Sequence, residues 1–270
     1  MKPSRRMIHL PSAARVAPLA ALSAVLVLGA GRARAQTAAS PSTTTAAVAT
    51  APMPMPITDN QVFAHALFNQ LELRPQGPDT GLRWDGEAWI GSDLNRVWFK
   101  SEGTVTRGPG SAGEIEALYD RPLPRLRYFD GQIGFREDIG AGPPRTWLAL
   151  GVEGLAPGFF EFEPTLYLGR GGRVAGRISG LYDLLLTQRL VAQPQLEMNF
   201  YGTPDPSRRL GTGLSDVDTG LRVRYEFSRK FAPYVGFTYA RKYGGTAALA
   251  RRAGEKAAGF TFVLGLRVWY

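Results

Sequence analysis

The residues able to bind a soft metal ion are few in this chain. It has 270 residues and no cysteine, which excludes disulfide scaffolds, zinc ribbons, iron–sulfur clusters and cysteine nucleophiles. Histidine and methionine are the remaining soft or borderline ligands, and methionine thioethers favour Cu(I) over harder ions. The sequence therefore limits a soft-metal site to a sparse candidate set: His65, Met53, Met55 and Met198.

Acidic residues offer a second chemistry, the attraction of cations. Alternate residues of an extended strand share a face, and by this parity one face of the expected strands is charged. Its principal acids are Glu87, Glu102, Glu114, Glu116, Glu161, Glu163, Glu197, Asp216 and Asp218. Its bases are Lys100, Arg136, Arg173, Arg177, Arg222 and Arg224. Two interpretations stay open, because such charges form either structural salt bridges or a path for cations.

No catalytic constellation emerges from the sequence. The run at 211–216 lacks the Gly-Lys-Ser/Thr ending of a phosphate-binding loop. A Ser–His–Asp arrangement has only His65 available once an N-terminal segment containing His9 is removed. The serines open to such a role are Ser101, Ser179, Ser215 and Ser228. We therefore expect no enzyme activity, with an outer-membrane hydrolase as the least favoured alternative.

The first 35 residues read as a secretory signal peptide. A basic start precedes an apolar stretch at about 16–30, and the small-x-small pattern at 33–35 places cleavage near Ala35-Gln36. An uncleaved anchor is the rival, although Pro18 interrupts a stretch that is short for a membrane helix. Arg5 and Arg6 also permit a loose twin-arginine signal.

Removal of the signal peptide lowers the net positive charge of the chain. The whole chain carries a net charge of +9, and 1–35 contributes six positive charges and no acid, which leaves +3. The basic excess thus gives little support to a nucleic-acid partner. Residues 36–58 are rich in Ala, Thr, Ser and Pro, so we expect a disordered leader there.

The rest of the chain, 59–270, alternates with a period of two. The C-terminus shows it best, since Phe260, Phe262, Leu264 and Leu266 occupy every second position and the chain ends at Tyr270. Segments of about ten residues suit tilted strands that cross a bilayer. Turn-rich clusters separate about twelve such segments, which predicts an all-β fold: a transmembrane, up-and-down antiparallel β-barrel.

A soluble β-sandwich or lipocalin shows the same alternation with a period of two, so other features must distinguish a membrane barrel from these soluble folds. The strands are longer than those of most soluble proteins. One face is densely charged, as a water-filled lumen allows. Aromatic residues such as Tyr225, Tyr234 and Trp269 lie near strand ends, where an interfacial aromatic girdle is expected. The longest connections are expected at about 202–213 and 243–257. Parity groups His65 with apolar Phe63, Leu67, Leu71 and Leu73, which predicts a position on the lipid side or in an irregular plug.

Several runs of residues resemble the copper-resistance protein B family. They are DNQVFAHALFNQLE at 59–72, WIGSDLNRVWFKSEG at 89–103, LLLTQRL at 184–190, GTGLSD at 211–216, FAPYVG at 231–236 and RKYGGTA at 241–247. The runs occur in order and cover nearly the whole mature chain. A terminal strand that ends in an aromatic residue also resembles the assembly signal of bacterial outer-membrane barrels.

The resemblance implies an outer-membrane protein of copper tolerance that binds, sequesters or passes copper ions. Copper would be cargo and not a catalytic cofactor. Its implied partners are outer-membrane lipid, a periplasmic multicopper oxidase and other copper-resistance proteins. The family's Met- and His-rich leader is reduced here to Met53 and Met55, which shifts the expected role to the barrel. The alternative is a general small-solute porin with a preference for cations.

Overall fold

The computed structural model describes residues 61–76, 79–106, 111–140 and 142–270. The predicted signal peptide at 1–35 and leader at 36–58 lie outside the described residues, and so do Met53 and Met55. The predictions that concern them stay predictions.

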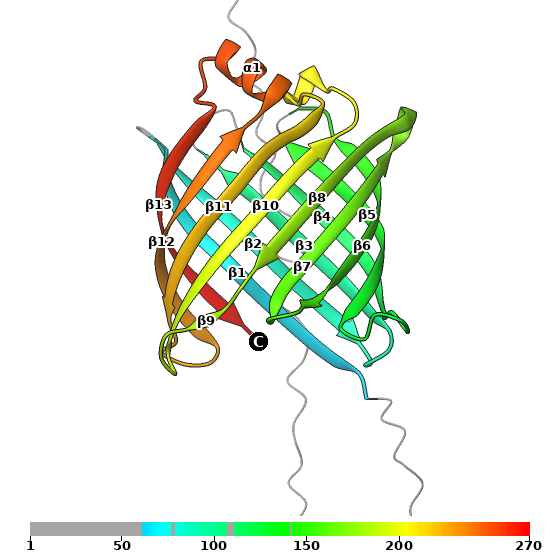
Figure 1. Ribbon diagram of the computed structural model, residues 1–270, viewed down its shortest axis with the longest axis vertical. Coiled ribbons are helices and arrows are strands. Elements are labelled where there is room, and N and C mark those ends of the chain that lie inside the picture. The colour runs from blue at the N-terminus through cyan, green and yellow to red at the C-terminus, as the bar shows by residue number, and fades with distance from the viewer. Residues whose placement is uncertain (1–60, 77–78, 107–110, 141) are drawn as a thin grey trace, which may run out of the picture. The chain divides into compact units, whose positions relative to one another are not determined.

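The described chain forms one closed antiparallel sheet (Figure 1). Each long strand pairs with the next long strand along the sequence, and β13 pairs with β1 to close the barrel. Reciprocal backbone hydrogen bonds between Ala66 and Tyr270 (2.8 and 2.9 Å) fasten this seam. The strands are β1 (Phe63–Gln76), β2 (Asp79–Gly91), β3 (Arg96–Val105), β4 (Ala112–Pro122), β5 (Phe129–Gly140), β6 (Arg145–Ala156), β7 (Phe160–Gly169), β8 (Arg173–Leu181), β9 (Leu184–Leu185), β10 (Leu190–Tyr201), β11 (Gly213–Tyr225), β12 (Phe231–Lys242) and β13 (Ala258–Trp269).

The two-residue strand β9 continues the position of β8, because both pair with β10. The barrel wall therefore has twelve strand positions, which confirms the expected count and fold class. An even number brings the last strand antiparallel to the first, so that an up-and-down meander closes without a crossover.

The barrel has two unlike ends (Figure 1). We call the end where β1 begins and β13 finishes the terminal end, and the opposite one the loop end. The long connections 202–212 and 243–257 both lie at the loop end, as the strand order requires. They contain the short helices η3 (Pro206–Arg208) and α1 (Gly244–Arg252), while η2 (Arg170–Gly172) joins β7 to β8. None of the helices in the described part of the chain is long and apolar enough to cross a membrane.

The outer face of the wall is apolar. Large side chains such as Phe99, Phe135, Phe237, Phe260 and Phe262 are each at least half exposed. They alternate with inward residues, as in β4, where outward Ile115, Ala117 and Tyr119 lie between buried neighbours. Exposed apolar surface on this scale marks contact with lipid or another apolar partner.

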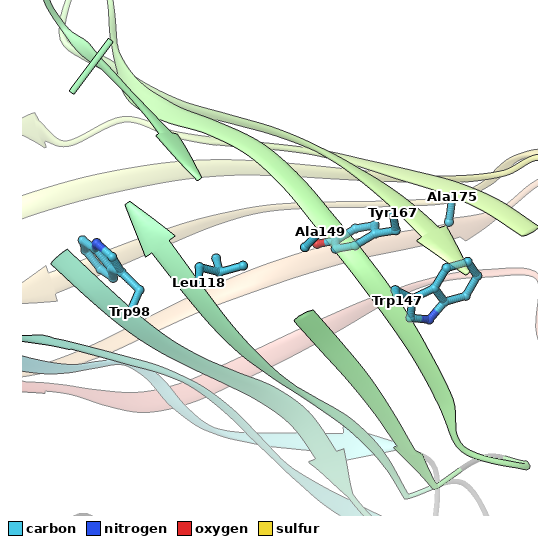
Figure 2. Packing of buried hydrophobic residues seen from close by; sticks show 6 residues of the cluster. All are labelled: Trp98, Leu118, Trp147, Ala149, Tyr167 and Ala175. Atoms are coloured by element: carbon cyan, nitrogen blue, oxygen red, sulfur yellow. The ribbon is translucent and has the colours of Figure 1, made fainter. Parts of the chain in front are cut away.

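The inner face combines charged residues with a small apolar cluster. Trp98, Leu118, Trp147, Ala149, Tyr167 and Ala175 form this cluster (Figure 2). Two of its aromatic members form hydrogen bonds with inward acids, since Trp147 Nε1 donates to Asp138 (2.9 Å) and Tyr167 donates to Glu116 (2.8 Å). Tyr234 also faces inward and donates to Glu72 (3.2 Å), so its expected place in an interfacial aromatic girdle is wrong.

A β-bulge in β1 overturns the predicted parity of that strand. Phe68 pairs with Gly86 and Gln70 pairs with Asp85, which leaves Asn69 as the extra residue. The bulge exchanges the two faces, so Leu67 lines the interior before it and Leu73 is exposed on the outside after it. His65 shares the inward face of Leu67, and its predicted position on the lipid side or in a plug is therefore wrong.

Candidate functional site

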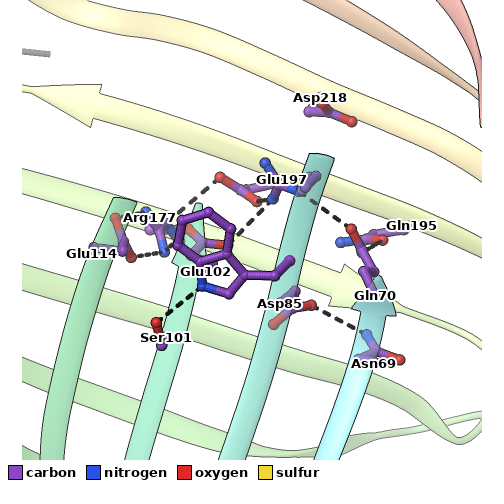
Figure 3. A network of polar contacts seen from close by, with 12 residues as sticks. Asn69, Gln70, Asp85, Ser101, Glu102, Glu114, Arg177, Gln195, Glu197 and Asp218 are labelled. Carbon is purple, nitrogen blue, oxygen red and sulfur yellow. Dashed lines mark hydrogen bonds and ion pairs between the residues drawn. The ribbon is translucent and has the colours of Figure 1, made fainter. Parts of the chain in front are cut away.

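Six charged side chains meet at the middle of the barrel interior and form what we call the mid-lumen layer. Its members are Arg83, Glu102, Glu114, Arg136, Arg177 and Glu197. Arg177 is the centre, with its two terminal nitrogens 2.6 and 2.9 Å from the carboxylate of Glu114 (Figure 3). Arg177 also lies 2.8 Å from Glu102, and three positive charges balance three negative ones across the layer.

The layer crosses the barrel. Four strands of the sheet order separate Glu102 on β3 from Arg177 on β8, and four separate Arg83 on β2 from Glu197 on β10. These strands lie almost opposite each other in a wall of twelve, yet the charged groups approach to 2.8 and 3.7 Å. Long side chains from both walls therefore meet in the lumen and leave no wide aqueous channel at this depth.

Hydrogen bonds extend the layer to the remaining side of the barrel. Gln70 on β1 donates to Gln195 on β10 (2.8 Å), and Arg83 donates to Gln70 (3.2 Å). Arg222 on β11 donates to Gln195 (2.7 Å) and to the fully buried Glu72 (2.5 Å). Since buried polar groups are costly when unpaired, this network constrains the positions of β1, β10 and β11 relative to one another.

Two cavities lie on either side of the layer. The cavity toward the terminal end has a volume of about 420 Å³, and the cavity toward the loop end about 410 Å³. Both are lined by Glu102 and Glu114, whereas Arg177 lines only the first and Arg136 only the second. The mid-lumen layer thus forms the shared wall between them.

The terminal-end cavity is strongly acidic. Ten carboxylates and three cations line it. Lys100 neutralises two of the acids, with its ammonium 2.6 Å from Glu163 and 2.8 Å from Glu153. Glu87 and Glu161 make no side-chain hydrogen bond or ion pair in the described part of the chain, so their carboxyl groups are free to contact a cation that enters the cavity.

The structure places the predicted acidic residues as follows. Seven of the nine line the terminal-end cavity: Glu87, Glu102, Glu114, Glu116, Glu161, Glu163 and Glu197. The other two also face inward on β11, where Asp216 accepts from Asn199 (3.0 Å) and Asp218 lies 3.5 Å from Arg74. Parity thus located these side chains, but it could not indicate which of them are neutralised across the lumen.

The two candidate soft ligands among the described residues, His65 and Met198, do not converge. His65 lies inside the terminal end between Trp89 and Trp269, with ring centroids 6.1 and 5.6 Å away. Met198 lies on the outer face of β10, because its neighbour Glu197 faces the cavity, and it cannot join His65 in one site. Among the described residues, no group of three or more His, Asp or Glu side chains could hold a metal ion.

Sequence reasoning missed several residues of the interior. Because of the bulge, the alternation of β1 did not assign Gln70, Glu72 and Arg74 to the inner face. Arg83 on β2 was also not assigned to the charged face. A signal for the first three exists, since Asn69 and Gln70 form a polar pair between Phe68 and Leu71 that interrupts the alternation. The contact of Arg83 with Glu197 has no sequence signal, because Glu197 lies on β10, across the barrel from β2.

Comparisons with known proteins agree with this fold. The family model described as "Copper resistance protein B precursor (CopB)" matches residues 62–270. Copper resistance protein B of Escherichia coli is 40% identical over 214 residues, which cover 79% of this chain and 72% of that protein. A homolog from Pseudomonas syringae pv. tomato shows the same identity and coverage.

Solved structures resemble the chain in fold alone. The NanC porin superposes with a TM-score of 0.50 at 11% identity, covering 76% of this chain and 99% of that one. The KdgM porin gives a TM-score of 0.45 at 12% identity, covering 76% and 98%. The first likeness supports a twelve-position barrel of the outer-membrane type.

Proposed function

Because this chain belongs to the copper resistance protein B family and is an outer-membrane β-barrel of copper resistance, we propose that it binds copper ions in its lumen and so sequesters or passes them at the outer membrane. Copper is cargo in this proposal, and the protein performs no enzyme chemistry. Outer-membrane barrels have short periplasmic turns and longer extracellular loops, which directs the terminal end to the periplasm.

The acidic terminal-end cavity is the observation that carries the proposal. Its excess of carboxylates, Glu87 and Glu161 among them, lowers the electrostatic energy of a cation that enters from the periplasm. The described residues offer no preformed cluster of three ligands, so we expect ions held loosely and exchangeably. Carboxylate oxygens are hard ligands, which favours Cu(II) over Cu(I) in this cavity.

His65 offers a second, softer point of contact at the same end. It is the third residue of β1 and lies a few residues after the leader that carries Met53 and Met55, and one imidazole with two thioethers suits Cu(I). We expect His65→Ala to weaken Cu(I) binding by the refolded protein more than Met53→Ala or Met55→Ala does. Equal affinities of the three variants would refute this ranking, and Met198→Leu on the outer face serves as the control.

The position of the mid-lumen layer disfavours the alternative function, an open porin for small solutes. Its salt bridges occupy the lumen between the two cavities, so passage of an ion requires Arg177 or its partners to move. In planar bilayers we expect the wild-type barrel to be closed most of the time. A large, steady conductance would instead favour the porin.

The resistance role is tested in the cell. A strain lacking the protein should lose copper tolerance, and the wild-type gene should restore it. A variant with Asp85→Asn, Glu87→Gln and Glu161→Gln should restore less while reaching the outer membrane in equal amount. Unchanged tolerance of the deletion strain would contradict the proposal. A periplasmic multicopper oxidase is the proposed recipient or donor of the ion, and copper transfer between the two purified proteins tests that partnership.

A further inference from the structure

The connection between β12 and β13 concentrates positive charge at the loop end. Residues 241–257 contain five basic residues and one acid, Glu255. That acid is already engaged, since its carboxylate accepts from Lys242 (2.8 Å) and pairs with Arg209. Four exposed cations of this segment have no acidic partner among the described residues: Arg241, Arg251, Arg252 and Lys256.

The segment that carries these charges is held in place. Thr246 of α1 accepts a hydrogen bond from the backbone of Gly211 (2.8 Å), and its hydroxyl lies 3.0 Å from that of Ser215. A Cβ at Gly211 would come within 2.6 Å of Gly245, so this close approach requires glycine. The basic connection is therefore docked against 211–215 rather than free above the barrel (Figure 1).

An apolar strip on the outer face of β12 and β13 extends from these basic residues toward the terminal end. Arg241 pairs across the strands with Ala258, and the next outward pairs are Tyr239 with Phe260 and Phe237 with Phe262. Phe260 and Phe262 are 75% and 61% exposed, and the rings of Tyr239 and Phe260 are 4.6 Å apart. Arg241 faces the same side and stacks on Tyr243, 5.0 Å from its ring centroid.

We propose that this surface binds a phosphorylated, multiply acylated glycolipid of the outer leaflet, with its phosphates on Arg241, Arg251 and Arg252 and its acyl chains on the strip of β12 and β13. The loop end faces the cell exterior, so the cations lie at the headgroup level of that leaflet. Several unpaired cations match a bisphosphorylated headgroup better than a single phosphate. The aromatic pairs supply the apolar surface that acyl chains cover. The site is separate from the lumen and does not depend on copper.

The test uses the full mature protein in detergent and measures binding of bisphosphorylated lipid A by native mass spectrometry. The variant Arg241→Gln/Arg251→Gln/Arg252→Gln should bind lipid A about 10- to 100-fold more weakly, because each arginine that contacts an anionic headgroup adds to the binding free energy. The matched control changes three exposed arginines of the terminal end: Arg125→Gln, Arg127→Gln and Arg229→Gln. It should bind as the wild type does, and heat-modifiable electrophoretic mobility verifies that each variant is folded.

Other probes separate the sources of phosphate. Monophosphorylated lipid A should bind several-fold more weakly than the bisphosphorylated form, and phosphatidylglycerol more weakly still. Equal loss in the two triple variants, or equal affinity for phosphatidylglycerol, would overturn the proposal. Complete displacement of the lipid by millimolar inorganic phosphate would also overturn it, since that outcome indicates a site for free phosphate.

Discussion

Removal of the Arg177 side chain is the sharpest perturbation of the barrel interior. Arg177→Ala deletes the bidentate pair with Glu114 and the contact with Glu102. Breaking a buried ion pair by removal of one partner typically costs about 3–5 kcal/mol, because a buried charge is left without compensation. Glu114 keeps Arg136 at 2.5 Å and Glu102 keeps Arg83 at 3.3 Å, which places the expected cost at the lower limit, about 3 kcal/mol.

Reversible urea unfolding in phospholipid vesicles, followed by tryptophan fluorescence, measures this loss. Arg170→Ala is the matched control, because Arg170 is exposed and has no ion pair among the described residues. Its free energy of unfolding should stay within about 0.5 kcal/mol of the wild type. If Arg177→Ala also stays within that range, Arg177 does not hold the mid-lumen layer together.

A double-mutant cycle then tests the assigned contact itself. Glu114→Gln combined with Arg177→Ala should cost less than the sum of the single changes, with a coupling energy of about 1 kcal/mol or more. The same Arg177→Ala barrel should open more often in planar bilayers, because the shared wall between the two cavities is weakened. Additive free energies would show that the 2.6 and 2.9 Å contacts contribute little.

Two further predictions concern the loop end. Gly211→Val should undock α1 and speed tryptic cleavage there at least about tenfold, while Gly259→Ala, where an added Cβ meets nothing, should not; equal cleavage would exclude the close contact. The hydrogen bond from Lys242 holds the pKa of Glu255 below its ordinary value, so this tether is present at neutral pH and is lost as the pH falls through the lowered pKa of the folded state. Because the chain has no cysteine, Ala253→Cys provides a single thiol for a nitroxide label. The label should become mobile when the pH is lowered from 7 to about 3. In a protein that also carries Glu255→Gln, it should be mobile at both pH values.

The sequence sufficed to predict the barrel because its strongest signal is strictly local. In β13, Phe260, Phe262, Leu264 and Leu266 all face outward, as their alternation indicates. Turn-rich clusters then divide the chain into strands, and an even number of them closes an up-and-down meander. The long connections follow from the same count, although the helix within 243–257 was not foreseen.

The interior could be predicted only in part. Alternation placed Glu102, Glu114 and Arg177 on one face, but their mutual contacts depend on barrel diameter and strand stagger, which no local pattern encodes. A single extra residue, Asn69, was enough to reverse the face assigned to the rest of β1 and to hide Glu72. His65 was misplaced for the same reason, since it was grouped with Leu71 and Leu73, which lie beyond the bulge.

Copper analysis of the purified protein tests the central claim most directly. The wild type and the Asp85→Asn/Glu87→Gln/Glu161→Gln variant are loaded with Cu(II), freed of unbound metal by rapid desalting and analysed for copper per chain. Each is measured with and without residues 36–58, so that binding by the leader is separated from binding by the barrel. The acidic cavity predicts copper on the wild-type barrel in both forms and much less on the variant. Equal copper on wild type and variant, or none on the wild-type barrel, would contradict the account.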